Sequence, residues 1–254
     1  MAPLRTPFQG VRNIVRFNWH FFALAAAGVG VGLLLAPWLP PAVRPLAYLG
    51  CIGMTLSTIA SLGSSYYVYD RSPLYRLEWL ARIRVPLGGT IVNVHAGFDE
   101  TSVLLRAGLP NAKLRVLDFY DPVQHTEISI RRARRAYPPF PDTETVQTAA
   151  LPLADASADA IFALFAAHEI RAEAERTAFF RELRRALRPD GRIVVTEHLR
   201  DWPNFMAYSI GFLHFYSRPV WERVFAEANL RVVERIQDIP LVTTFILEAR
   251  AAAP

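Results

Sequence analysis

The sequence predicts an α/β domain with a mostly parallel, doubly wound sheet, preceded by two membrane-spanning helices. Three observations lead to this fold class. Two long apolar segments without charge lie near the N-terminus. Strand-like runs alternate with helical patterns through the rest of the chain. The last two strand-like runs are separated only by a short link, as in an antiparallel hairpin.

Composition narrows the classes of protein. Hydrophobic residues make up 52% of the 254 residues and charged residues 20%, so the apolar excess must be local. The single cysteine, Cys51, excludes an internal disulfide framework and a cysteine-cluster metal site. The net charge of +5 rests on arginine, but the arginines form no stripe interleaved with aromatic residues. We therefore expect no nucleic-acid partner, and without an H-E-x-x-H or comparable spacing we expect no metal site.

The N-terminal segment is expected to form a membrane hairpin. No charged residue occurs between Phe21 and Trp38, and none between Pro45 and Tyr69. A cleaved signal peptide is the alternative for the first run, but it lacks a small-x-small cleavage site and a second apolar run follows at once. We expect a hairpin over residues 1–70, with spans at about 21–39 and 45–67.

Arginine placement predicts the orientation of this hairpin. The connection between the spans carries only Arg44, whereas the two outer flanks carry Arg5, Arg12, Arg16, Arg71, Arg76, Arg82 and Arg84. Cytoplasmic flanks are enriched in positive charge. We therefore expect a multi-pass protein with two spans, whose termini and C-terminal domain are cytoplasmic and whose first partner is the lipid bilayer.

Gly28, Gly30 and Gly32 form a G-x-G-x-G string that looks like a nucleotide-binding loop. No strand precedes it and its surroundings are wholly apolar, which argues against that interpretation. Gly28 and Gly32 are four residues apart and share one helix face, as do Gly53 and the serines that follow it. Close packing of the two spans is therefore the better explanation.

The strand-like runs that define the domain follow a linker over residues 71–86. They lie at 90–95, 114–118, 159–165, 192–197, 230–236 and 242–248. Helical patterns follow Asp99 and occupy Ala178–Leu187, and Pro189-Asp190-Gly191 is expected to turn the chain into the next strand. Repeated β-α units with a closing antiparallel hairpin predict a Rossmann-like sheet over 87–254.

This order of segments resembles the class I S-adenosylmethionine-dependent methyltransferases, of the type 11 kind, over roughly Leu87 to Arg250. In that family a Gly-x-Gly-x-Gly loop follows the first strand, and here Gly97 matches its middle glycine. Asp118 matches the acidic residue that ends the second strand and binds the ribose hydroxyls. A tract beginning Leu151-Pro152 and the tract LRPDGRIVV from Leu187 are also similar to the family.

The resemblance implies S-adenosyl-L-methionine as cofactor. Asn93 stands where the family has an acid, and could still accept a hydrogen bond. The cofactor-binding residues that the resemblance implies are Asn93, His95, Ala96, Gly97, Asp118, Phe119, Leu151 and Phe165.

Histidines and acids follow the fourth and fifth strand-like runs, where ligands of open α/β sheets bind. A histidine is the natural base for a hydroxyl acceptor, although it could equally cap a helix or bridge two loops. The aromatic stretch Trp202–Tyr216 suits a mostly apolar pocket, or an ordinary buried helix. The candidate catalytic residues are His168, Glu169, His198 and His214.

The leading hypothesis is therefore a methyltransferase that acts on a lipophilic or membrane-associated small molecule. The alternative is a non-catalytic, membrane-anchored Rossmann-like module with a degenerate cofactor site. A dinucleotide-dependent oxidoreductase would need a glycine-rich first turn that this chain lacks. The basic run from Arg131 to Arg135 is either a solvated face or a contact to anionic headgroups. The methyl acceptor and the oligomeric state stay open.

Overall fold

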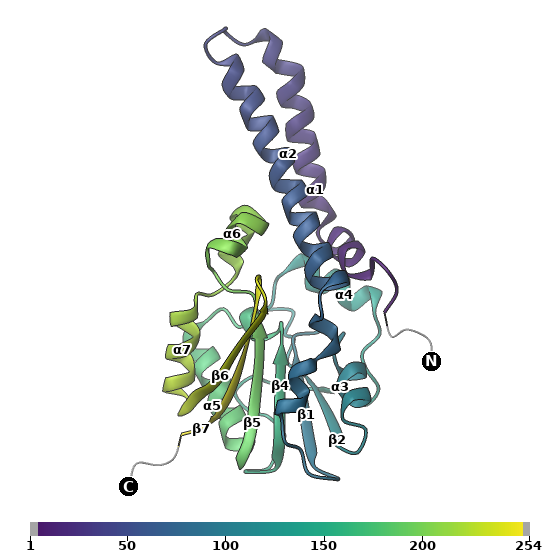
Figure 1. Ribbon diagram of the computed structural model, residues 1–254, viewed down its shortest axis with the longest axis vertical. Helices are drawn as coiled ribbons and strands as arrows, with labels where there is room; N and C mark the ends of the chain where they lie inside the picture. Colours follow the sequence, from purple (N-terminus) through teal and green to yellow (C-terminus); the bar gives the residue numbers. More distant parts are fainter. Residues whose placement is uncertain (1–4, 251–254) are drawn as a thin grey trace.

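The computed structural model describes residues 5–250 as an α/β domain from which a two-helix hairpin extends (Figure 1). The hairpin consists of α1 (Gln9–Leu35), a short 3-10 turn η1 (Ala36–Trp38) and α2 (Arg44–Tyr66). Both helices are long and apolar enough to cross a membrane, and only 6% of each apolar window is buried. They are therefore not core helices of the domain.

The domain is built on one seven-stranded sheet in the order β3-β2-β1-β4-β5-β7-β6. Every pairing is parallel except those of β7 with β5 and with β6, so the predicted doubly wound sheet with a closing hairpin is confirmed. The strands are β1 (Thr90–His95), β2 (Lys113–Asp118), β3 (Glu144–Thr145), β4 (Ala158–Leu164), β5 (Leu187–Glu197), β6 (Leu230–Ile239) and β7 (Val242–Ala249).

Helices and short turns cover both faces of this sheet. The α-helices are α3 (Ser102–Gly108), α4 (Ile128–Ala136), α5 (Glu173–Ala186), α6 (Trp202–Tyr208) and α7 (Arg218–Glu227). The short turns are η2 (Tyr67–Arg71), η3 (Leu74–Arg76), η4 (Glu78–Arg82), η5 (Ala167–Glu169) and η6 (Ser209–His214). Apolar side chains of α5 and α7 form the larger core cluster, and Trp79 and Leu105 belong to the cluster on the other face. The stretch 71–86, expected as a linker, thus packs on the sheet.

The predicted turn at Pro189-Asp190-Gly191 lies within β5 instead. Along β4 and β5 the pairing jumps from Ala158 opposite Leu187 to Ala160 opposite Arg192, so the extra residues of β5 form a bulge. A Cβ on Gly191 would lie 3.0 Å from the carbonyl oxygen of Asp159. Pro189, Asp190 and Gly191 therefore form a bulge, at which Gly191 allows the close approach of the β4 backbone, and they do not separate a helix from the start of a strand.

Glycine contacts confirm the close packing of α1 on α2. A Cβ on Gly28 would lie 3.2 Å from Met54 Sδ, and one on Gly32 would lie 2.5 Å from Cys51 Sγ. Gly30, on another face of α1, has nothing within 4 Å. Gly53 of α2 also has nothing within 4 Å, so this glycine does not belong to the contact.

The first three turns of α1 belong to the domain rather than to the apolar part of the hairpin. Asn18 leaves helical geometry at φ −114° and ψ 18°, which separates residues 9–18, here called the α1 foot, from the rest of α1. Asp70 accepts hydrogen bonds from the amides of Gly10 and Val11 at 2.7 and 2.8 Å. Tyr137 donates to Asn13 Oδ1 at 2.9 Å. These bonds fix the foot above the carboxyl ends of the strands.

Candidate active site

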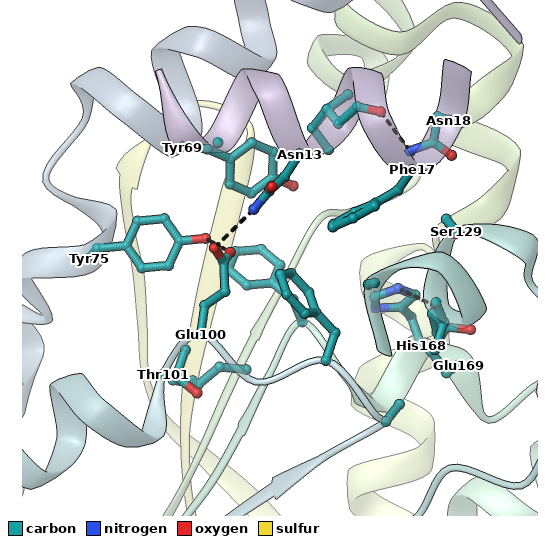
Figure 2. Close-up of a pocket in the computed structure, with 18 residues that line it drawn as sticks. Asn13, Phe17, Asn18, Tyr69, Tyr75, Glu100, Thr101, Ser129, His168 and Glu169 are labelled. Carbon is teal, nitrogen blue, oxygen red and sulfur yellow. Dashed lines mark hydrogen bonds and ion pairs between the residues drawn. The ribbon is translucent and has the colours of Figure 1, made fainter. Parts of the chain in front are cut away.

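A cavity of about 220 Å³ lies between the α1 foot and the carboxyl edge of the sheet. Figure 2 shows Glu100 and Tyr75 at one side of it, His168 and Glu169 at the other, and Phe17 of the α1 foot between them. The remaining lining comes from Gly10, Asn13, Ile14, Asn18, Tyr69, Ala96, Phe98, Thr101, Ser129, Ile130, Ala133, Leu164 and Phe165. Five separate stretches of chain therefore meet at one mostly apolar space.

The loop after β1 is held from below by Asn93. Its Nδ2 donates to Thr101 Oγ1 at 3.0 Å and to Ser102 Oγ at 2.8 Å. Asp99 Oδ1 accepts the amides of the same two residues at 2.8 and 2.9 Å, which satisfies free donors at the start of α3. Asn93 Oδ1 is buried and has no partner among the described residues. The amide thus ties the loop to α3 and leaves an acceptor unused.

His95 and Gly97 shape the same loop. His95 Nδ1 accepts the Gly97 amide at 3.0 Å. Burial lowers the pKa of His95, and the carboxylates of Asp99 and Asp118 only partly oppose it, so the imidazole is neutral at pH 7. Gly97 has φ +91°, a conformation that a side chain would strain. The positive φ of Gly97 therefore explains why a glycine stands at this position of the loop.

Asp118 ends β2 beside His95, to which it is paired in the sheet. It is 3% exposed, and its Oδ1 accepts the Tyr120 amide at 2.9 Å. Its Oδ2 forms an ion pair with Arg134 of α4. A Cβ on Gly97 would lie 2.6 Å from Arg134 Nη1, which places the guanidinium between the loop after β1 and the carboxylate.

This geometry decides how the site fits an adenosyl cofactor. The buried carboxylate of Asp118 and the open backbone at Gly97 are the two anchors that such a group needs. The guanidinium of Arg134 lies in the space between them, and the Arg134 side chain is 37% exposed. The two anchors fit the cofactor only if Arg134 leaves this gap.

The other expected cofactor residues divide into two groups. Ala96 and Phe165 line the cavity, and Phe165 has φ +51°, which is rare for a residue with a bulky side chain. Phe119 instead packs in the core, with its ring centroid 5.3 Å from that of Phe179. Leu151 lies in the same core cluster, and its amide donates to Glu182 of α5. Phe119 and Leu151 therefore do not line the cavity.

His168 lies between two carboxylates at the end of β4. Its Nδ1 is 2.6 Å from Glu197 Oε2, and its Nε2 is 3.1 Å from Glu169 Oε1. Burial alone would lower the pKa of His168, but Glu197 and Glu169 outweigh it and raise that pKa to about 10. Burial likewise opposes ionisation of Glu169, yet hydrogen bonds from His168 and His214 hold its pKa well below the usual range. The three groups form one ion-paired unit.

His214 reaches this unit from η6. Its Nε2 is 3.6 Å from Glu169 Oε1 and its Nδ1 is 3.5 Å from Glu127 Oε1. Arg171 donates to the His214 carbonyl at 2.8 Å and also contacts the ring nitrogens. Three of the four expected catalytic residues, His168, Glu169 and His214, are thus brought together.

His198 is placed elsewhere. It is 4% exposed, with Nδ1 2.7 Å from the Leu241 carbonyl and Nε2 2.7 Å from the Tyr69 hydroxyl. Both ring nitrogens are therefore occupied, and the residue does not line the cavity. His198 therefore connects η2 to the turn before β7, which is the structural role, bridging two loops, that a histidine at a strand end can equally have.

Sequence reasoning missed the residues that the hairpin contributes. Asn13 and Phe17 come from the α1 foot and Tyr69 from η2, and all three line the cavity. Nothing in the sequence connects these positions with the cavity residues of the sheet, which begin 27 residues after Tyr69 and more than eighty residues after Asn13. Glu197 was detectable in principle, because it ends the strand-like run directly before His198.

A family model matches part of the sheet domain. Residues 116–195 match a family model described as a methyltransferase domain. No curated protein matches the chain.

Solved structures share the fold. A putative type 11 methyltransferase from Sulfolobus solfataricus is 17% identical with a TM-score of 0.50, covering 72% of this chain and 95% of its own. An S-adenosylmethionine-dependent methyltransferase from Clostridium acetobutylicum is 9% identical with a TM-score of 0.50, covering 70% and 90%. LepI, in a complex with SAH and a substrate analogue, is 15% identical with a TM-score of 0.51, covering 77% and 53%.

The matched domain and the strand order agree on one assignment. Because their sequence identities are low, the solved structures support only the fold. The family model supports the presence of a methyltransferase domain. By the family model over residues 116–195 the chain contains a methyltransferase domain, and its fold is that of S-adenosylmethionine-dependent methyltransferases.

Proposed function

We propose that this methyltransferase is anchored in a membrane by α1 and α2 and methylates a lipophilic small molecule that enters the cavity from the bilayer side. One observation carries the proposal: the cavity is lined jointly by the α1 foot and by His168 and Glu169 at the carboxyl edge of the sheet. An acceptor that leaves the lipid along α1 would therefore arrive beside the polar groups of the site.

The surface of the hairpin supports the anchor. Large apolar side chains point outward along both helices, with Leu24 67%, Leu34 70%, Leu46 66% and Ile59 61% exposed. In water such a continuous apolar surface would be unfavourable, whereas lipid tails would cover it. Helix α4 packs against α1, and its Arg131 and Arg135 are exposed, where anionic headgroups could bind them.

The cavity is lined by both apolar and polar side chains, which would bind different parts of an acceptor. Phe17, Phe98 and Phe165 would hold an apolar body, and Glu169 and His168 would bind its polar end. S-adenosylmethionine, held between the Gly97 loop and Asp118, would supply the methyl group. Because Ala96 and Phe98 line the cavity from that same loop, the acceptor would lie next to the cofactor.

The test uses the full-length protein in vesicles made from a bacterial lipid extract, with methyl-labelled S-adenosylmethionine. We expect label in the organic phase, and mass spectrometry should find a lipid heavier by one CH2. Glu169→Gln should lower the labelling rate at least tenfold, whereas Glu222→Gln, on the exposed face of α7, should leave it unchanged. Label found only in water-soluble products would contradict the proposal.

A second candidate is a non-catalytic, membrane-anchored module. The ion pair of Arg134 with Asp118 favours it, because the guanidinium occupies the gap that the cofactor needs. Calorimetry with S-adenosylhomocysteine separates the two candidates. Binding that Asp118→Ala abolishes supports the enzyme, and absence of binding supports the module.

A further inference from the structure

We propose that His168, Glu169 and His214 form a binding site for a divalent metal ion of the zinc type. Their potential ligand atoms all lie within 4.8 Å of one another. The Nε2 atoms of the two histidines are 3.1 and 3.6 Å from Glu169 Oε1. Ligands of a tetrahedral zinc ion with bonds of about 2.0–2.1 Å are roughly 3.3 Å apart, so these two distances bracket the required geometry.

The groups behind the histidines are the second observation. Glu197 Oε2 is 2.6 Å from His168 Nδ1, and Glu127 Oε1 is 3.5 Å from His214 Nδ1. In metal sites a carboxylate commonly accepts the Nδ1 proton and thereby turns Nε2 toward the ion. Glu197 is itself fixed, since its other oxygen accepts the His168 amide at 3.2 Å. Both rings thus present Nε2 to the same carboxylate oxygen.

The donor set indicates which metal fits. Two imidazoles and one carboxylate suit zinc and its neighbours, whereas magnesium and calcium prefer oxygen ligands throughout. Three protein ligands leave a fourth position open. His168 and Glu169 line the cavity, so that position would face it. A role for the ion in holding an acceptor oxygen rests on the proposed function, but the site itself does not.

Arg171 is the cation that stands near His214 in this structure. Its Nη2 is 2.7 Å from His214 Nε2 and 3.7 Å from Glu127 Oε1. The side chain is 39% exposed, so it can turn into solvent without moving the backbone. A divalent ion would take the place of this guanidinium beside His214 Nε2 and would also neutralise Glu169.

Cobalt titration of the full-length protein in detergent tests the site after removal of metals with a chelator. We expect one saturable equivalent of Co²⁺, with visible absorption bands of a four- or five-coordinate ion that zinc displaces. His214→Ala should weaken binding at least tenfold and change the spectrum. Glu127→Gln keeps all three ligands and should weaken binding about tenfold through the orientation of His214.

His20→Ala is the matched control, because it removes a histidine of α1 that does not belong to the cluster. It should bind cobalt as the wild type does. Absence of saturable binding to the wild type, or equal affinity and spectrum in His214→Ala, would overturn the site. Cobalt binding is read without methyl transfer, so a protein that binds cobalt but labels no lipid refutes the proposed function alone.

Discussion

At the scale of single residues, charged groups at the carboxyl edge of the sheet are each held by a partner from another element. Asp118 of β2 pairs with Arg134 of α4, and His168 of η5 pairs with Glu197 of β5. Such pairs keep buried charges satisfied, and removing one partner leaves the other exposed to its full desolvation cost. Each pair therefore has a measurable consequence for ligand binding or stability.

Arg134→Ala should tighten binding of S-adenosylhomocysteine by a few-fold, because the guanidinium no longer competes for Asp118. The pair is partly exposed, and such pairs contribute about 1 kcal/mol or less. Calorimetry on the full-length protein measures the change. Arg131→Ala, an exposed residue of the same helix, is the control and should leave affinity unchanged. Weaker binding in Arg134→Ala would mean that the guanidinium contacts the ligand instead.

His198 predicts an acid-sensitive fold. Burial lowers the pKa of His198 to about 4, whereas an unfolded histidine titrates near 6.5. Its contribution is complete above pH 6.5 and is lost as the pH falls toward 4, because only the unfolded chain then takes up the proton. The loss reaches about 3 kcal/mol at most. In thermal unfolding from pH 7 to 4, His198→Asn should show a shallower decline than the wild type; equal slopes would refute this.

Sequence reasoning located most site residues at or just after the end of a strand. Asp118 ends β2, and His168 and Glu169 follow β4 within five residues, so their place at the ligand edge could be predicted. Phe119 follows Asp118 just as closely, yet its side chain points into the core. Successive residues of an extended chain face opposite ways, and the face could not be assigned without knowing which helices cover it.

At the scale of elements, local pattern predicted six of the seven strands, but neither the short β3 nor the α1 foot. β1 was predicted with its observed bounds, because β-branched residues end there at small ones. In the sequence, the α1 foot is only a more polar segment that precedes an apolar run. Its place over the sheet depends on Asp70 and Tyr137, which are distant in sequence and connect to it only in the folded protein.

The contact between α1 and α2 gives a prediction with an internal control. Gly32→Val should destabilise the hairpin, because a Cβ at this position would lie 2.5 Å from Cys51 Sγ and the helices would have to separate. Overpacking of this kind costs about 1–3 kcal/mol. Gly30→Val adds the same side chain where nothing lies within 4 Å and should have little effect. Thermal unfolding in detergent compares the two; equal melting temperatures would contradict the packing.

At the scale of the whole molecule, the hairpin and the domain are parts of one site. The α1 foot lines the cavity, and α2 continues into η2, which carries Tyr69. The chain then runs on through η3 and η4, where Leu74 and Trp79 are buried. The apolar part of the hairpin points away from the sheet (Figure 1). If that part is inserted in a bilayer, the carboxyl edge of the sheet faces the membrane surface, and the arginines of both flanks lie on the domain side.

That arrangement predicts which surfaces lie on opposite sides of the membrane. In a Cys51→Ser background, which removes the chain's single cysteine, Pro41→Cys places a thiol in the exposed connection between the helices and Glu222→Cys places one on α7. A membrane-impermeant maleimide added to intact cells should label the first variant and not the second, because positive flanks stay in the cytoplasm. Glu222→Cys should react only after the cells are opened. Labelling of both variants from the same side would show that the two helices do not cross the bilayer, and the route proposed for a lipophilic acceptor would then lose its basis.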